Sequence, residues 1–322
     1  MSRLRWGVLG AANIARAQFL PAVLETGQRA VLVGGRDGAR AAEFARAHGV
    51  ERSVQGYAAV LEDPEVDAVY VPLPNRLHTE WTVAALQAGK AVLCEKPLCL
   101  DPAQVEQVLA VARTATQPLW EAFVFPFQAQ HARVVELLED GAIGELREVV
   151  SSFHFEVGGP DNIRLSRAMG GGALADVGCY PMRLAHELFG VPAGSATVTA
   201  LMGEEVEIDV SALMAYPGDR RLLLTCGFRR AYDTTTLLLG TQGSMRLDNP
   251  FHPGRASALE VHRAGADPVV ERPTKNDRSF SGALRHIAAV LAGDQPPTHT
   301  ALDSALPVAQ SLQLAQRALA NQ

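Results

Sequence analysis

Short apolar runs alternate with segments of helical periodicity through the first third of the chain. The apolar runs predict buried strands at 4–9, 30–34, 68–72, 91–94 and 118–122. The segments between them carry apolar residues at helical spacing. Because alternating strands and helices build parallel sheets, we expect an α/β domain over residues 1–122.

The pattern changes after about Phe125. One helix is predicted at 128–139, and longer strand-like segments follow at 146–157, 195–202, 208–216, 222–228 and 234–239. Turn signals such as Tyr216-Pro217-Gly218-Asp219 separate these segments, which favours an antiparallel sheet. Helical patterns return at 281–291 and 301–319. We therefore expect a second α/β domain, with a mainly antiparallel sheet, over residues 123–322.

Composition restricts the class of protein. The 322 residues are 48% hydrophobic and 20% charged, which is enough for two globular domains. A net charge of −6 is not the basic balance of a nucleic-acid-binding protein. No segment has the length of a membrane span or the features of a secretory signal. The four cysteines lack metal-ligand spacing, so we expect free thiols, no metal and a cytoplasmic protein.

The segment Glu95-Lys96-Pro97 directly follows the predicted strand at 91–94. Open α/β sheets bind their ligands at the carboxyl ends of the strands. This position makes Lys96 a candidate reactive group, although a lysine at a strand end can also be merely solvated. The sequence leaves the isomer of the Lys96–Pro97 bond open.

The run Gly10-Ala11-Ala12-Asn13-Ile14-Ala15 follows the first predicted strand, where a Gly-x-Gly-x-x-Gly fingerprint would stand. Backbone amides at such a turn, together with the helix dipole, favour a pyrophosphate group. Of the three glycine positions, only Gly10 is glycine, and alanines occupy the other two. Taken alone, the run fits an ordinary strand-to-helix turn equally well.

The second predicted strand ends at Arg36, close to where a dinucleotide-binding domain contacts the adenosine ribose. A guanidinium group suits a 2′-phosphate, whereas an acidic residue would suit a free 2′-hydroxyl. Arg40, one helical turn later, could add a second positive charge, and Asp37 is expected to cap the helix. We therefore expect NADP(H) rather than NAD(H), with a surface arginine as the alternative.

Four segments together resemble the glucose-fructose oxidoreductase/inositol dehydrogenase (Gfo/Idh/MocA) family. They are the run from Gly7 to Ala15, the segment Pro72-Leu73-Pro74-Asn75-Arg76-Leu77-His78, the segment Cys94-Glu95-Lys96-Pro97-Leu98, and the block from Gly170 to Pro181. The last block is most similar to the branch of NADP-dependent D-xylose dehydrogenases and dimeric dihydrodiol dehydrogenases. The resemblance covers nearly the whole chain.

The resemblance implies a Rossmann dinucleotide-binding domain, followed by a substrate domain whose open sheet face commonly builds a dimer. We therefore expect a homodimer, with a tetramer left open. It implies catalytic roles for Lys96 and Tyr180, with Asp176 in support. The cofactor contacts it implies are Gly10, Ala12, Asn13, Ile14, Arg36, Arg40, Pro72, Asn75, His78, Glu95 and Lys96. The implied substrate contacts are Asn162, Arg164, Asp176 and Tyr180.

The residue chemistry of the last block agrees with these roles. Asp176 and Tyr180 are four residues apart, so on one helix they share a face. A phenol has an ordinary pKa near 10, and a nearby ammonium such as that of Lys96 would favour its phenolate. Tyr180 could instead be a packed tyrosine, and Pro181 implies that the helix either starts or breaks nearby.

One segment departs from the family pattern. After Phe123 the family commonly has an arginine and a histidine, whereas this chain has Pro126 and Gln128. The pocket beside them should therefore be more neutral, which leaves the identity of the substrate open. Asn162 and Arg164 match the family branch.

The expected activity is hydride transfer between NADP(H) and a hydroxyl-bearing carbon of a sugar, cyclic polyol or dihydrodiol. The expected partner is therefore a small molecule. An alternative within enzymes is a reductase of a keto-sugar or related carbonyl. An alternative outside enzymes is a nucleotide sensor that keeps the fold without turnover.

Overall fold

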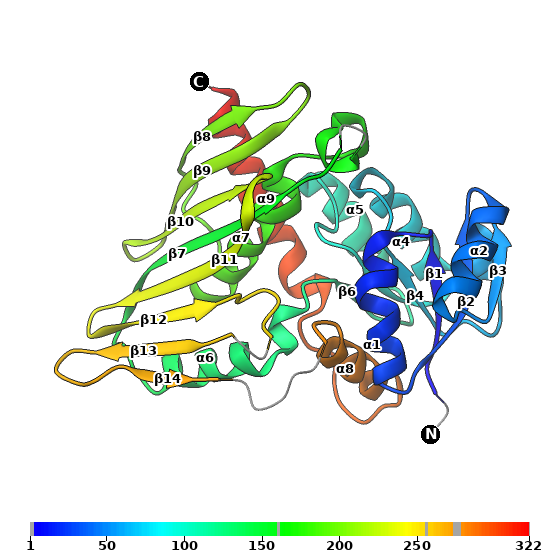
Figure 1. Cartoon of the computed structure of the whole chain (residues 1–322), viewed down its shortest axis with the longest axis horizontal. Helices are drawn as coiled ribbons and strands as arrows, with labels where there is room; N and C mark the ends of the chain where they lie inside the picture. The colour runs from blue at the N-terminus through cyan, green and yellow to red at the C-terminus, as the bar shows by residue number, and fades with distance from the viewer. Residues whose placement is uncertain (1–2, 160–161, 255–256, 273–277, 322) are drawn as a thin grey trace. The chain divides into compact units, whose positions relative to one another are not determined.

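The computed structural model describes residues 3–159, 162–254, 257–272 and 278–321 (Figure 1). The described chain forms two compact units. Of the described residues, the first unit contains 3–99, 103–124 and 278–305, and the second contains the others. The chain leaves the first unit after residue 124, and residues 278–305 belong to the first unit again.

The first unit is built around a six-stranded parallel sheet with the order β3-β2-β1-β4-β5-β6. Its strands are β1 (Arg5–Leu9), β2 (Arg29–Gly35), β3 (Arg52–Gln55), β4 (Ala68–Val71), β5 (Ala91–Cys94) and β6 (Leu119–Glu121). All five predicted strands are present. The edge strand β3 escaped prediction because its four residues are mostly polar.

The helical elements of this unit connect these strands, except for α8 (Ser281–Leu291), which comes much later in the chain. The connecting elements are η1 (Ala15–Phe19), α1 (Leu20–Glu25), α2 (Gly38–His48), α3 (Ala58–Glu62), η2 (Asn75–Leu77), α4 (His78–Gln87) and α5 (Pro102–Ala112). Helix α8 buries Leu284 and Ile287 beside α1. The Gln28 side-chain amide donates to the Leu284 carbonyl at 2.9 Å, which ties this late helix to the sheet.

The second unit contains an eight-stranded sheet with the order β14-β13-β12-β11-β7-β10-β9-β8. Its strands are β7 (Leu146–Glu156), β8 (Ala196–Met202), β9 (Glu207–Tyr216), β10 (Arg220–Gly227), β11 (Arg229–Gly240), β12 (Gly243–Asp248), β13 (Leu259–Arg263) and β14 (Val269–Glu271). All pairs are antiparallel except β7 with β10, so the prediction of a mainly antiparallel sheet is confirmed.

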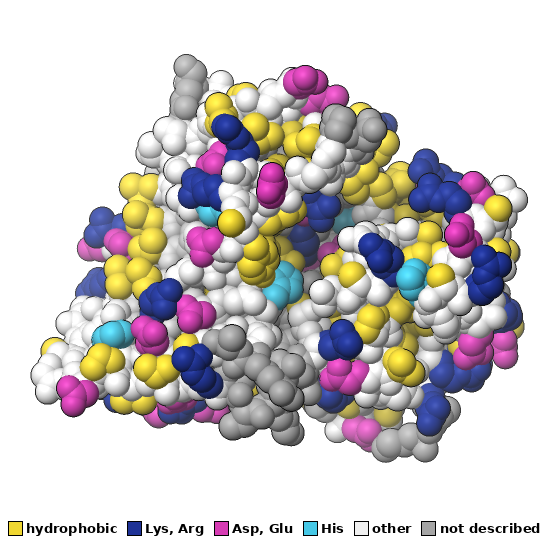
Figure 2. Space-filling model, in the orientation of Figure 1, with side chains coloured by type: hydrophobic (Ala, Val, Ile, Leu, Met, Phe, Trp, Pro, Cys, Tyr) yellow, Lys and Arg dark blue, Asp and Glu magenta, His cyan; other side chains and the backbone are white. Residues whose placement is uncertain are grey.

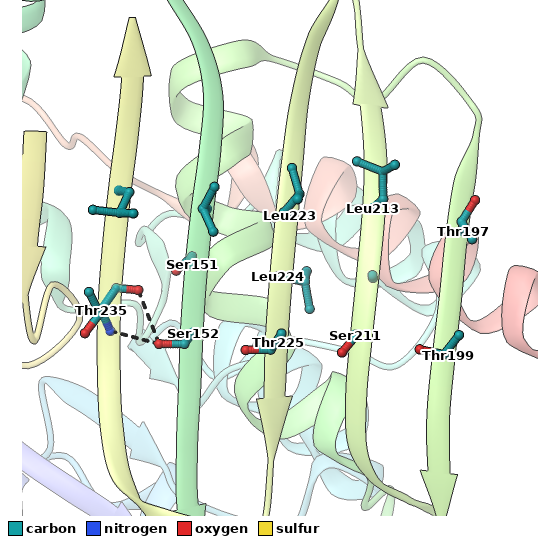
Figure 3. A pocket seen from close by; sticks show the side chains of 13 residues that line it. Ser151, Ser152, Thr197, Thr199, Ser211, Leu213, Leu223, Leu224, Thr225 and Thr235 are labelled. Carbon is teal, nitrogen blue, oxygen red and sulfur yellow. Dashed lines mark hydrogen bonds between the residues drawn. The ribbon is translucent and has the colours of Figure 1, made fainter. Parts of the chain in front are cut away.

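Helices lie against one face of this sheet. The helical elements that begin in this unit are η3 (Phe125–Phe127), α6 (Ala129–Glu139), η4 (Ile163–Leu165), η5 (Arg167–Met169), η6 (Leu174–Gly178) and α7 (Cys179–Phe189). Helix α9 (Ala301–Ala320) begins in the first unit and continues into the second. Figure 3 shows helices behind the strands, while side chains such as Thr225 and Leu213 project from the opposite, open face.

The cysteines are buried and charged side chains lie on the surface (Figure 2), as expected for a folded globular chain. All four cysteines are buried free thiols. Figure 2 shows positive and negative side chains interspersed on the visible face, as expected for a chain of modest net charge. Within the described residues, no helix has both the length and the apolar character needed to span a membrane.

Candidate functional site

The turn after β1 has the geometry of a phosphate cradle. Gly10 has a φ of +99°, which favours glycine, and its N–H donates to the Gly34 carbonyl at 2.7 Å. The helical run then begins at Asn13, and the Ala12 carbonyl accepts a bond from Arg16 N–H at 3.3 Å. The amides around Ala12, Asn13 and Ile14 therefore lie at the start of a helix, where they can bind an anion.

An open hollow of about 680 Å³ lies beside Arg36 in the same unit. Gln55, Tyr57 and Trp81 also line it, and the Tyr57 and Trp81 rings meet edge to face at 5.0 Å. A Cβ placed on Gly10 would lie 3.9 Å from the Tyr57 hydroxyl, so the hollow adjoins the phosphate turn. Aromatic walls and a guanidinium suit an adenosine that carries a 2′-phosphate.

The sequence motifs gave no indication of Gln55, Tyr57 and Trp81, because these residues come from two segments more than 20 residues apart. Gln55 ends β3, Tyr57 directly precedes α3, and Trp81 lies in α4, so only the fold brings the three side chains together. Asp37 caps α2 as predicted, accepting bonds from the amides of Ala39 at 2.9 Å and Arg40 at 3.1 Å. The Arg40 side chain is exposed in the first turn of α2.

His78 is fully buried, although the resemblance implies a cofactor contact for it. Its ring nitrogens lie 2.8 Å from the carbonyls of Pro97 and Leu73. Burial lowers the pKa of His78, and the positive charge of Lys96 acts in the same direction. The imidazole therefore links the segments that follow β4 and β5 and has a structural role. Pro72 lies buried on the first of these segments, and Asn75 begins η2 after it.

Glu95 and Lys96 follow β5 at the carboxyl edge of the sheet. The Tyr70 hydroxyl donates to Glu95 Oε1 at 2.6 Å, which fixes that carboxylate. Lys96 is half-buried, and the Lys96–Pro97 peptide bond is cis. The lysine thus lies on the first unit, at the edge where sheets of this kind bind their ligands.

Arg164 and Asp176 form an ion pair in the second unit. Arg164 Nε donates to Asp176 Oδ2 at 2.7 Å, and the guanidinium carbon lies 5.5 Å from the Phe155 ring centroid. Asn162 caps the short helix that bears Arg164, because its Oδ1 accepts a bond from the Arg164 amide at 3.1 Å. The structure thus brings together three of the four predicted substrate residues.

Tyr180 lies on the continuous helical run that starts at Ala173, and it is 5% exposed. Its ring packs against the rings of Phe251 and His252, with centroid-to-centroid distances of 5.2 Å and 5.5 Å. Asp176 belongs to η6, a π-helical segment that leads directly into α7. The α-helix itself starts at Cys179, so Pro181 lies in its first turn, in agreement with the expectation that a helix starts nearby. The wider hydrogen-bonding pattern of η6 comes just before the position where proline lacks an N–H.

Pro126 and Gln128, the two departures from the family pattern, are both buried in the second unit. Gln130, two residues later, donates to the carbonyls of Asp248 at 3.2 Å and Ala258 at 3.3 Å. Among the described residues, no group of three or more histidine, cysteine, aspartate or glutamate side chains is arranged to hold a metal ion.

Two family models match the chain in the order of its two sheets. Residues 4–123 match the oxidoreductase family with an NAD-binding Rossmann fold, and residues 131–246 match the GFO/IDH/MocA C-terminal domain. The chain belongs to the Gfo/Idh/MocA oxidoreductase family. It is therefore an enzyme of the oxidoreductase class with a Rossmann first domain, as the sequence motifs predicted.

Members of the Gfo/Idh/MocA family similar to this chain act on different substrates. The dTDP-3,4-didehydro-2,6-dideoxy-alpha-D-glucose 3-reductase of Streptomyces antibioticus is 39% identical over 88% of this chain and 87% of its own. The D-xylose 1-dehydrogenase (NADP(+)) 2 of Haloferax volcanii is 31% identical over 91% of each chain.

A solved structure extends the likeness to the whole fold. The 3-ketoreductase KijD10 of Actinomadura kijaniata, in complex with NADP and TDP-benzene, superposes with a TM-score of 0.87. It is 32% identical and covers 99% of this chain and 98% of its own.

Proposed function

We propose that this protein is an NADPH-dependent reductase that transfers hydride to the ketone of a nucleotide-linked keto-sugar. The observation that carries the proposal is the likeness, over most of both chains, to a dTDP-keto-sugar 3-reductase. The likeness to KijD10 supports it independently at the level of structure. The expectation of a dehydrogenase for free sugars or diols therefore becomes the second candidate.

The hollow beside Arg36 supports NADP(H) as the cofactor. Its guanidinium would pair with the 2′-phosphate, while Tyr57 and Trp81 would flank the adenine. The amides after Gly10 would bind the pyrophosphate. When bound, the nicotinamide supplies the hydride, and the protein supplies orientation and a proton.

In this proposal Tyr180 gives its proton to the carbonyl oxygen as hydride reaches the adjacent carbon. Lys96 hydrogen-bonds to the same oxygen. Its positive charge also stabilises the phenolate that forms when Tyr180 gives up its proton. Asp176, held by Arg164, orients the sugar hydroxyls. Solved KijD10 variants replace one lysine and one tyrosine, and these are separated by the same number of residues as Lys96 and Tyr180.

A substrate panel tests the proposal. The purified protein is incubated with NADPH and dTDP-3,4-didehydro-2,6-dideoxy-alpha-D-glucose, with the corresponding free sugar, or with simple ketones. We expect NADPH oxidation to be fastest with the nucleotide-linked keto-sugar. Equal rates with the free sugar would refute recognition of the nucleotide, and the absence of oxidation with any carbonyl would refute the reductase.

D-xylose oxidation is the second candidate, because the Haloferax volcanii relative spans nearly the whole chain. The same preparation with NADP⁺ and a panel of aldoses distinguishes it. NADPH formation with an aldose, at a kcat/KM above that of the keto-sugar reaction, would make this candidate the better description.

We also propose that the protein works in the cytoplasm as a homodimer joined through the open sheet face. Five hydroxyl side chains form one row across neighbouring strands: Thr199, Ser211, Thr225, Ser152 and Thr235 (Figure 3). A mostly apolar row lies beside it, and both rows line a shallow hollow of about 460 Å³. Leu213 in the apolar row is 44% exposed. A second copy, related by a two-fold axis, would cover both rows.

A further inference from the structure

Three consecutive glycines precede the helix that carries Asp176 and Tyr180. At Gly171 a Cβ would collide with the Arg164 carbonyl oxygen, and at Gly172 it would collide with the Glu207 carboxylate. Gly172 also has a φ of +115°, which side chains rarely allow. The backbone therefore runs directly against a charged group of β9.

The Glu207 carboxylate occupies the position where a helix cap is needed. The Gly172 carbonyl accepts a bond from Asp176 N–H at 3.0 Å, so Gly172 is the residue that would normally offer a capping side chain. It has none. Glu207 Oε1 instead accepts a bond from Leu174 N–H at 3.1 Å, although it belongs to a distant strand.

The same backbone segment holds the ion pair of the site. Gly172 N–H donates to the Arg164 carbonyl at 2.9 Å, and Arg164 Nε donates to Asp176 Oδ2 at 2.7 Å. Together with the bond from Asp176 N–H to Gly172, these contacts form a closed ring of three residues. Glu207 contacts the ring at Gly172 and anchors it to the sheet.

We propose that Glu207 is a positioning residue, whose carboxylate caps the helix and thereby sets the placement of Asp176 and Arg164 for the reaction. The inference rests on the proposed function for its kinetic consequence. Its structural part does not depend on which substrate is used. Burial raises the pKa of Glu207, because a buried carboxylate loses its hydration.

Three variants separate the reach of the side chain from its charge. Glu207→Ala removes the acceptor, Glu207→Asp keeps the charge but is one methylene shorter, and Glu207→Gln keeps an acceptor oxygen at the original reach. We expect Ala and Asp to lower kcat for the keto-sugar by about tenfold or more, because small misplacements of positioning groups have large kinetic effects. We expect Gln to retain most of kcat, and all three to leave the KM for NADPH unchanged.

Hydrogen exchange supplies a readout that does not depend on turnover. Amides in the peptide 172–178 should exchange faster in Glu207→Ala and Glu207→Asp than in the unmodified protein, while Glu207→Gln keeps their protection. Glu205→Ala is the matched control, because its exposed carboxylate accepts a bond from Arg167 N–H at 2.7 Å on the adjoining turn. This control should change neither the exchange nor kcat.

Normal kcat and normal exchange in Glu207→Asp would overturn the proposal, even if Glu207→Ala fails to fold. A loss of kcat in Glu207→Gln equal to that in Glu207→Asp would also overturn it, since an acceptor oxygen at the original reach would then not be enough to position the helix. If the unmodified protein reduces no keto-sugar, the proposed function fails, whereas the exchange experiment still decides the role of Glu207.

Discussion

At the residue scale, Arg36 and His78 show how far local sequence determines a role. The end of a strand predicted the position of Arg36, and the fold places it beside a hollow. His78 belongs to a family motif, yet both its ring nitrogens face backbone carbonyls. A sequence motif tells which residues occur together, whereas burial decides whether a side chain faces a ligand. Glu207 went unnoticed because its partner is the backbone of a distant segment.

Replacing Arg36 with Asp tests the choice of cofactor. The change removes charge-assisted hydrogen bonds to the 2′-phosphate and adds repulsion, so NADP⁺ binding should weaken by about 2 kcal/mol, roughly thirtyfold in Kd. Titration calorimetry measures this loss. Arg46→Asp makes the same charge change at an exposed position of α2 and should leave Kd nearly unchanged. Equal affinity of the unmodified protein for NADP⁺ and NAD⁺ would show that the assignment of Arg36 is wrong.

Replacing Tyr180 with Phe separates chemistry from binding. The ring keeps its packing against Phe251, but the acidic proton is lost, so kcat should fall by about 10²-fold while NADPH affinity stays the same. Lys96→Met should have a similar effect. The losses should not add in the double variant, because both residues act on one proton. Near-normal turnover of Tyr180→Phe would reduce Tyr180 to a packing residue.

At the element scale, the hydrophobic pattern predicted most strands and helices, because long apolar runs and helical spacing are local properties. It missed β3 and the three strands β12, β13 and β14, because none of them contains an apolar run longer than two residues. It predicted a helix at 281–291, which is α8, but not that α8 packs in the first unit. Helical periodicity identifies an apolar face, and only the complete fold determines which core that face covers. The π-helical geometry of η6 could not be predicted from the sequence, in which Pro181 is the only indication of an irregular helix.

The helix cap gives a pH-dependent prediction. Burial raises the pKa of the Glu207 carboxyl group above its value in the unfolded chain. The folded state therefore binds the carboxyl proton more tightly than the unfolded state does. Its contribution to stability is therefore greatest below the unfolded pKa of about 4.3 and is lost as pH rises through the folded pKa.

Glu207→Gln should consequently have a Tm at neutral pH equal to or above that of the unmodified protein, and this advantage should shrink on acidification. Thermal melts at a series of pH values measure it, with Glu205→Gln reporting the effect of removing a surface charge. A Tm that is clearly lower for Glu207→Gln at neutral pH would mean that the carboxylate serves stability.

At the scale of the whole molecule, the order of motifs and the change of pattern near Phe125 predicted two sheets of different kinds. The open face of the second sheet raises the question of assembly. In a two-fold dimer, a substitution on this face occurs in both copies of the interface. One charged residue introduced on the face should therefore weaken the dimer.

We expect light scattering at micromolar concentration to give a dimer mass for the unmodified protein and a monomer mass for Leu213→Asp. Val270→Asp is the control, because Val270 is 52% exposed but lies on the edge strand β14. This variant should remain dimeric. A monomer mass for the unmodified protein would rule out the proposed dimer.

Hydride transfer from NADPH to the ketone of a nucleotide-linked sugar can be followed directly with an isotope. The most direct measurement uses NADPH deuterated at the transferring position of the nicotinamide, with the dTDP-linked keto-sugar as acceptor and mass spectrometry of the sugar product. We expect one deuterium on the sugar carbon that gains a hydroxyl, and we expect Tyr180→Phe to form this product much more slowly. A reduced product without deuterium, or no reduced product at all, would contradict it.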